Sequence, residues 1–304
     1  MTVWLDAVEP PVELSNAGLT YLTDGSLAYA GMYRHERAHA LHTHSFLEIV
    51  VVLGGDGVHH CLSGRRRLRR GDVLVLRPGV WHAYERCRAL HLYNCCVDTG
   101  LLDHELAWTR EDPALSYLMW TGPMGAGRHG TLTFRIDDAA VEACRRHLDA
   151  LNALRGEPPE RHRADIIGEL LLLAARLAGA VDRREPVAPT HPAVAQAMRL
   201  LEARLAHRWT LTELAGELHL TPGYLVRLFR SSTGLPPMAY LARRRVEVAS
   251  SRLLHGGEPI TQIARAVGWP DQNYFARRFR AHLGMSATAY RRSFGRSMTV
   301  PPGE

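Results

Sequence analysis

Three histidines and a glutamate are spaced so that their side chains could gather around one ligand. His42, His44 and Glu48 occupy positions of the same parity, so in an extended strand both imidazoles and the carboxylate project to one face. His82 comes after Gly79, at the end of another apolar run. Imidazole and carboxylate groups can bind divalent transition metals. The pattern therefore predicts a candidate metal site made of His42, His44, Glu48 and His82.

Two interpretations of this cluster stay open. In the first, a divalent metal holds or tunes a small-molecule effector, or serves a metal-dependent enzyme. In the second, the same side chains hydrogen-bond the effector or one another without a metal. No cofactor is therefore assigned with certainty. The candidate effector-binding set is His42, His44, Glu48, His82 and Tyr84, and the aromatic residues that would suit a sugar or an aromatic ligand are Tyr29, Tyr33, Phe46, Trp81 and Tyr84.

Polar side chains on two helical segments of the C-terminal half form the second group that could do chemistry. In the first segment Leu225 and Phe229 predict a buried face, which leaves the opposite face to long polar side chains. Arg, Gln and Asn can pair bidentately with guanine and adenine edges in the major groove of DNA. The residues on these polar faces are Arg227, Arg230, Gln272, Asn273, Arg277, Arg278 and Arg280.

These segments belong to an internal duplication. A series of apolar residues that begins at Leu211 recurs 49 residues later, and the series from Tyr224 to Tyr240 recurs 50 residues later from Tyr274 to Tyr290. Eleven matched positions in the same order make chance an improbable source of the repeat.

Each copy of the duplication has the layout of a helix-turn-helix. In the first copy Thr210 and Glu213 can form a capping box, and Thr221 can cap a second helix. The turn falls at His219 in the first copy and at Gly268 in the second, where glycine can supply a positive φ. We therefore predict that the C-terminal half binds DNA.

The distribution of charge supports this prediction. The chain has 304 residues, enough for about two domains, and its 37 basic side chains are all Arg. Codon bias would place Arg instead of Lys throughout the chain. Only the location of the net charge can therefore distinguish codon bias from a binding function. Residues 190–304 carry a net charge of +9 and residues 1–189 a net charge of −3. A basic module that follows an acidic one is expected where only one half meets a polyanion.

Residues 191–294 resemble the DNA-binding domain of AraC/XylS-family transcription regulators. The motifs that carry the resemblance are Ile260-Thr-Gln-Ile-Ala264, Val267-Gly-Trp269, Asn273-Tyr-Phe-Ala-Arg-Arg-Phe279, and Gly284-Met-Ser286 to Tyr290-Arg291. Two positions depart from the family pattern, Trp269 in place of Phe and Ala287 in place of Pro. The resemblance implies two helix-turn-helix units joined by a long helix over residues 237–254, which enter successive major grooves about 34 Å apart.

The resemblance also assigns the residues that face the bases. In the first copy these are Gly223, Val226 and Arg227, of which only Arg227 can make a strong polar contact. The second copy offers Gln272, Asn273 and Arg277, so we predict that it provides more of the hydrogen-bonded discrimination. The full candidate DNA-binding set is Gly223, Val226, Arg227, Arg230, Gln272, Asn273, Arg277 and Arg278.

The N-terminal half resembles a cupin barrel. His42, His44, Glu48 and Gly55 match the first cupin motif, and Gly71, Gly79 and His82 match the second. Arg77 stands where the second motif usually has Pro, and Arg86 where Asn is common. Many AraC/XylS regulators are known to sense a small molecule with such a barrel.

We expect an α+β fold of two domains, in which a cupin-like β-barrel with flanking helices precedes an all-α domain with two helix-turn-helix motifs. Strand-like apolar runs between Gly-rich turns predict the barrel, and two amphipathic helices over about 137–155 and 164–180 could pack on it or on a second subunit. The expected boundaries are the barrel over 1–136, the helical pair with a possible role in dimerisation over 137–181, a linker over 182–190, the DNA-binding domain over 191–296 and a tail over 297–304.

The sequence favours a ligand-responsive regulator that is not an enzyme, and no residue is assigned a catalytic role. The alternative is a cupin metalloenzyme with an accessory DNA-binding tail. The expected partners are double-stranded DNA, a small-molecule effector, a second copy of the chain and, if the protein is an activator, RNA polymerase. No basic and then apolar leader opens the chain, and five cysteines without a paired spacing favour a reducing cytoplasm.

Overall fold

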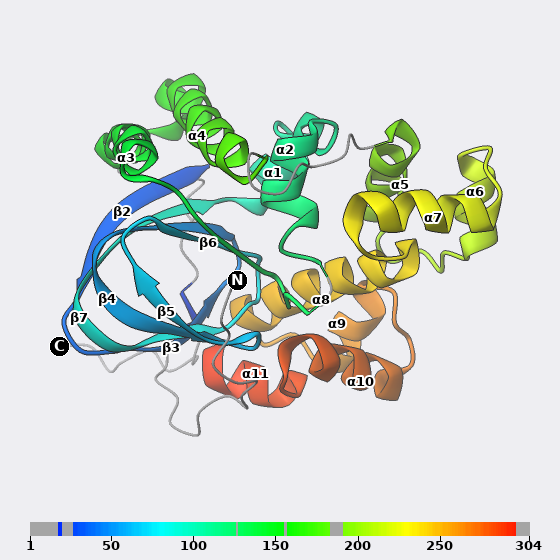
Figure 1. The fold of residues 1–304 in the computed structure, drawn as a ribbon. Coiled ribbons are helices and arrows are strands. Elements are labelled where there is room, and N and C mark those ends of the chain that lie inside the picture. The colour runs from blue at the N-terminus through cyan, green and yellow to red at the C-terminus, as the bar shows by residue number, and fades with distance from the viewer. Residues whose placement is uncertain (1–17, 20–26, 126, 155–156, 183–190, 296–304) are drawn as a thin grey trace.

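Figure 1 presents the computed structural model of the protein, which describes residues 18–19, 27–125, 127–154, 157–182 and 191–295. The predicted linker from residue 183 onward and the predicted tail over 297–304 lie outside these ranges, so those boundaries stay predictions. Among the described helices, none is long and apolar enough to cross a membrane.

The N-terminal half is a rolled, mostly antiparallel sheet, as predicted (Figure 1). The path of paired strands is β1-β3-β7-β4-β6-β8, with β2 paired to β7 and β5 to β4. Its strands are β1 (Gly18–Leu19), β2 (Ala28–His35), β3 (His39–His44), β4 (Leu47–Cys61), β5 (Gly64–Arg69), β6 (Asp72–Leu76), β7 (His82–Val97) and β8 (Thr131–Arg135). The long strands β4 and β7 pair with each other along most of their length, with register shifts around Gly54.

A bend in the long strands requires glycine at position 55. Gly55 has a φ of 71°, and a Cβ atom there would lie 2.0 Å from the carbonyl oxygen of Ala89. Only glycine adopts this backbone without a clash, so strand β4 can turn here against β7.

The two faces of the sheet are both buried, with different partners. Ile49 and Val51 of β4 point outward, into the core shared with the covering helices. Val50 and Val52 point inward, into the core of the barrel. This period of two places Glu48 inside the barrel, which is the side predicted from its spacing to His42 and His44.

Helices cover the outer face of the sheet. The predicted helix that follows residue 137 is α3 (Asp138–Ala153), and Asp137 caps it by accepting a 2.8 Å hydrogen bond from the backbone N of Ala140. The next helix, α4 (Pro159–Asp182), begins five residues before the predicted start. The apolar faces of both helices are covered within the chain, against each other and β2. Of the two packing partners that the sequence allowed for, the structure pairs these faces with the chain's own core.

A helical insertion between β7 and β8 was not predicted. It consists of α1 (Thr99–Asp103), the 3-10 turn η1 (Ala107–Arg110), α2 (Pro113–Ser116) and the π-helical turn η2 (Tyr117–Thr121). Each piece is at most five residues long, which is too short to show a helical period in the sequence. The insertion lies between the barrel and the C-terminal helices (Figure 1).

The C-terminal half is all-helical and contains both predicted helix-turn-helix units. Its helices are α5 (Pro192–Ala203), α6 (Leu211–Glu217), α7 (Pro222–Thr233), α8 (Pro237–His255), α9 (Ile260–Ala266), α10 (Gln272–Leu283) and α11 (Ala287–Phe294). Thr210 and Thr221 cap α6 and α7 as predicted. The turns fall at His219, with a φ of 53°, and at Gly268, with a φ of 86°. The long helix α8 joins the two units.

A buried ion pair joins the barrel to α8. Arg77 follows β6 and is 1% exposed, and its Nε and Nη2 atoms donate to the two carboxylate oxygens of Glu247 at 2.9 and 2.8 Å. The third contact of this guanidinium is the Met119 carbonyl, at 2.9 Å. Glu247 also accepts from Arg244. Burial alone would raise the pKa of Glu247, but Arg77 and Arg244 lower it below its usual value.

The ion network continues to the first helix-turn-helix unit. Arg110 of η1 donates to Asp103 at 2.8 Å and to Glu202 of α5 at 2.5 Å. Its guanidinium carbon lies 3.6 Å from the ring centroid of Trp120. Arg244 reaches Asp103 at 3.2 Å as well. The orientation of the DNA-binding helices is therefore tied to the barrel by buried, hydrogen-bonded charges.

We expect Glu247→Gln to lower the free energy of unfolding by about 3–5 kcal/mol, because two arginines would keep their buried charge without its carboxylate. Urea denaturation followed by circular dichroism measures the change. The matched control is Glu258→Gln, because Glu258 binds Arg252 in the same bidentate manner, at 2.9 and 2.7 Å, but in a partly exposed position. The control should cost less than about 1 kcal/mol. Equal losses for the two variants would contradict the importance of burial.

We also expect stability to fall in acid through His282. Burial and then the nearby positive charges of Arg278 and Arg243, with His129 beside them, lower the pKa of His282 to about 4. Because the unfolded chain takes up this proton first, the stabilising contribution is complete above pH 6.5 and is lost as the pH falls toward 4. His282→Gln should therefore reduce the slope of unfolding free energy against pH in this window by up to about 1.4 kcal/mol per unit. Identical slopes in the two proteins would refute this assignment.

Candidate DNA-reading helices and ligand site

The predicted DNA-contacting residues of the first unit lie on the exposed side of α7. Gly223, Arg227 and Arg230 are exposed and Val226 is half-buried, whereas Phe229 is fully buried in the core. This is the arrangement expected of a recognition helix, in which one face anchors the helix and the other remains free for a groove.

Helix α10 of the second unit has a more polar free face. Gln272, Asn273 and Arg277 are exposed. Arg278 is half-buried, and its Nε atom is fully buried beside the domain junction, with its charge close to His282. The structure thus brings three of these four residues to the free face of α10, while Arg278 lies at its edge.

Two tyrosines accompany the recognition arginines and were not among the predicted contacts. Tyr224 and Tyr274 are 39% and 40% exposed, at equivalent positions of the duplication. The guanidinium carbon of Arg227 lies 5.7 Å from the ring centroid of Tyr224, and that of Arg277 lies 5.8 Å from that of Tyr274. Such cation–π contacts restrict a long side chain before it binds. The repeated pair of an exposed Tyr and an Arg three residues later was the signal available in the sequence.

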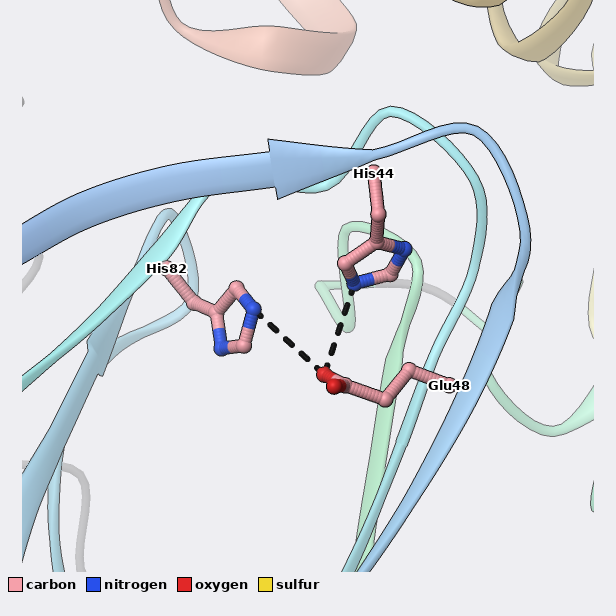
Figure 2. Close-up of side chains that lie close together, drawn as sticks. All are labelled: His44, Glu48 and His82. Carbon is pink, nitrogen blue, oxygen red and sulfur yellow. Dashed lines mark ion pairs between the residues drawn. The ribbon is translucent and has the colours of Figure 1, made fainter. Parts of the chain in front are cut away.

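The barrel interior contains the second candidate site. His44 at the end of β3, Glu48 at the start of β4 and His82 at the start of β7 converge, as Figure 2 shows. The Nε2 atoms of His44 and His82 each lie 3.5 Å from Oε2 of Glu48. All three side chains are at most 5% exposed. Ligands that bind one zinc ion tetrahedrally at 2.1 Å are separated by about 3.4 Å, so this spacing fits a metal.

The surroundings of the three side chains also fit a metal. Nδ1 of His44 donates to the Phe46 carbonyl at 2.8 Å, which leaves the lone pair of Nε2 directed at Glu48. Asn94 donates to Oε1 of Glu48 at 2.8 Å and leaves Oε2 available. Contacts of this kind hold metal ligands in orientation.

Several buried polar atoms at this site lack hydrogen-bond partners within the described part of the chain. They are Nε2 of His44, Oε2 of Glu48, both ring nitrogens of His82 and of His59, and the hydroxyl of Tyr84. Buried polar atoms are almost always satisfied in folded proteins. These unsatisfied atoms make the cluster a candidate site for a metal or for an effector with hydrogen-bonding groups.

Of the four predicted metal ligands, His42 is the one whose ligand atom lies outside the cluster of close ligand atoms. Only His44, Glu48 and His82 place ligand atoms within 4.8 Å of one another among the described residues. Nδ1 of His42 donates to the carbonyl of Ala40 at 2.9 Å, as Nδ1 of His44 does to that of Phe46, so the position of its ring and not its hydrogen bond sets His42 apart. Its ring still packs 4.1 Å from that of His82, measured between centroids, so the parity argument gave the correct face but not the correct contacts.

A cavity of about 80 Å³ adjoins the cluster. Its volume suits a metal with a few waters or a small effector. Burial lowers the pKa of His42 to about 4, so this imidazole is neutral near pH 7 and can accept a hydrogen bond. The residues that line the cavity are Tyr33, His35, His39, His42, His44, Phe46, Glu48, Tyr84, Asn94 and Cys96.

Trp81 lies outside this cavity, which corrects its inclusion among the candidate ligand contacts. Its side chain is 1% exposed and packs in the core of the second helix-turn-helix unit. The alternation of strand residues explains the difference, because Trp81 precedes His82 and so points to the opposite face of the sheet.

Family models match both halves of the chain. The model described as an AraC-like ligand binding domain matches residues 25–153. The model described as a helix-turn-helix domain matches residues 214–293. The first match contains the barrel site and the second contains α7 and α10.

The chain is similar to proteins named HTH-type transcriptional activator RhaR. It is 27% identical over 274 residues to the one from Pectobacterium carotovorum, covering 90% of this chain and 93% of the relative. It is 29% identical over 261 residues to the one from Klebsiella pneumoniae, covering 83% and 87%.

A solved structure has the same fold. ToxT from Vibrio cholerae, bound to a naphthalenyl butenoic acid, superposes with a TM-score of 0.51 at 11% identity and covers 88% of this chain and 99% of that one. The family models together, the relatives and the solved structure thus include both halves of the chain.

Proposed function

The chain belongs to the AraC family of transcription regulators, and we propose that it activates transcription by reading two successive major grooves under the control of an effector held in its barrel. The observation that carries this proposal is the duplicated recognition surface. Arg227 and Arg277 are exposed at equivalent positions of two helix-turn-helix units, each beside an exposed tyrosine. Two such helices fit half-sites about one helical turn apart.

The two recognition helices have different roles in this proposal. In α7 the free face offers Arg227 as its strong base-reading group, because Gly223 and Val226 can make only close or apolar contacts. In α10 Gln272 and Asn273 can pair with adenine and Arg277 with guanine. Arg230 and Arg278 contribute positive charge for the phosphates.

The effector site is the barrel cavity around His44, Glu48 and His82. These three residues would hold a divalent metal, which would supply a positive charge to anchor an electron-rich group of the effector. Without a metal, the same unpaired nitrogens and carboxylate, with Tyr84, would hydrogen-bond the effector directly. His42 would contact the effector from the cavity wall in either case.

The names of the relatives support the role of an activator, which implies contact with RNA polymerase. We further propose that the protein acts as a homodimer in the cytoplasm. All five cysteines lie in the described part of the chain as buried thiols, which suits a reducing compartment. Because the inner faces of α3 and α4 are covered, the dimer would use their outer surface, where Leu172 is 49% exposed.

We expect Arg277→Ala and Arg227→Ala each to weaken specific DNA binding by about 5- to 150-fold, the equivalent of 1–3 kcal/mol for one bidentate base contact. Scrambling the half-site that α10 reads should cost more affinity than scrambling the other. Fluorescence anisotropy with a duplex selected from a random library measures both effects. The control is Arg67→Ala, an exposed arginine of β5 in the barrel. Equal losses from scrambling either half-site would contradict the unequal roles.

Metal content of the purified protein tests the effector site. We expect one divalent ion per chain, which Glu48→Gln or His82→Ala removes and His42→Ala retains, because His42 stands outside the cluster. Inductively coupled plasma mass spectrometry provides the measurement, and a thermal-shift screen of small metabolites identifies the effector. A metal-free protein with an intact effector response would refute the metal and favour direct hydrogen bonding.

A further inference from the structure

The strand segments that carry the ligand site also carry the contacts to the second helix-turn-helix unit. In β3, Thr43 lies between His42 and His44 and points to the opposite face. Its hydroxyl donates to the carbonyl of Val80 at 3.1 Å and lies 3.0 Å from the hydroxyl of Tyr290 in α11. Thr43 and Tyr290 are both completely buried. The thickness of a single strand thus separates the ligand cavity from the DNA-binding domain.

The same arrangement recurs at the start of β7. Trp81 precedes His82, and its indole N–H donates to the carbonyl oxygen of Leu283, the last residue of recognition helix α10, at 2.8 Å. Leu41, Trp81 and Ala83 share one hydrophobic core with the helices of the second unit. The residue next to His82 is therefore hydrogen-bonded to the end of α10.

A glycine joins the two contacts into one cluster. The backbone N of Gly79 donates to the carbonyl of His44 at 2.8 Å, and its carbonyl accepts from the Tyr290 hydroxyl at 3.1 Å. Gly79 has a φ of 83°, and a Cβ there would lie 2.1 Å from Oγ of Ser250 in α8. At Gly79 the loop before His82 therefore packs against α8 with no room for a side chain.

The internal duplication provides a comparison within the molecule. Tyr240 occupies the position of Tyr290 in the first unit and is equally buried, but its hydroxyl donates to Glu202 of α5, within the DNA-binding domain. A Cβ at Gly284 would lie 2.7 Å from Leu62 of the barrel, whereas one at the equivalent Gly234 would meet nothing closer than 4.0 Å. Of the two units, only the second contacts the barrel through these repeated tyrosine and glycine positions.

We propose that Thr43, Trp81 and Tyr290 are positioning residues that couple the barrel ligand site to the second helix-turn-helix unit, so that occupancy of the site resets the orientation of α10. The inference rests on the proposed function of the barrel site. Coupling of this kind requires that a ligand distinguish two arrangements of the interface. The hydroxyl pair and the indole contact are the groups that differ between those arrangements.

A mutational cycle tests the coupling. Glu48→Gln changes the charge of the ligand site without any added ligand, and a Zn²⁺ titration provides a second perturbation. Each is measured by the affinity for the selected duplex in four backgrounds: the unaltered chain, Tyr290→Phe, Thr43→Val and the matched control Tyr240→Phe. We expect a change of about fivefold or more in the unaltered and Tyr240→Phe backgrounds. In the Tyr290→Phe and Thr43→Val backgrounds this change in affinity should fall below about twofold. The change should also require the half-site that α10 reads.

Hydrogen exchange of residues 283–294 provides a readout that does not depend on DNA. Glu48→Gln should change exchange there in the unaltered chain and in Tyr240→Phe, and not in Tyr290→Phe or Thr43→Val. The same responses in all four backgrounds, or none in the unaltered chain, would overturn the coupling while leaving DNA binding intact. A chain that binds no duplex would refute the proposed function, and hydrogen exchange would still decide the coupling. Absence of a Zn²⁺ effect alongside a Glu48→Gln effect would refute only the metal.

Discussion

The bidentate ion pair between Arg77 and Glu247 is the interaction on which the arrangement of the two domains depends. Two fully buried charges would be costly alone, so each requires the other in place, and Arg244 extends the requirement to α5. Arg77 is also one of the two residues that depart from the cupin pattern, at a position where proline is usual. Proline has no side-chain donor and could not make this contact. The departure at position 77 therefore provides the contact between the barrel and the DNA-binding domain.

The alternation of strand residues gives the barrel two different roles. Inward residues such as His44 and His82 line the proposed ligand site, and their neighbours Thr43 and Trp81 contact the second helix-turn-helix unit. Because a strand is one residue thick, a shift of the residues on one face also moves the residues on the other face. A close-packed interior transmits such a shift instead of absorbing it. Sensing and DNA reading are thus physically adjacent in this chain.

The duplicated helix-turn-helix units share their cores and caps but differ in their surroundings. The first unit contacts the helical insertion between β7 and β8 through Arg110 and Glu202. The second contacts the barrel strands through Tyr290 and the end of α10. Equivalent residues have therefore acquired different partners, as Tyr240 and Tyr290 illustrate. The unit with the more polar recognition face is the one in direct contact with the ligand-carrying strands.

The sequence alone determined the family, the two-domain fold, the helix-turn-helix units and the face of β3 that carries His42, His44 and Glu48. These features follow from local periodicity, capping and motif spacing, which neighbouring residues specify. Only the tertiary structure decided that His42 stands apart from the metal cluster, that Trp81 faces the DNA-binding domain and that Arg77 binds Glu247. Such contacts join residues as far apart as 202 positions along the chain. Spacing cannot specify them, because packing of the completed fold selects each partner.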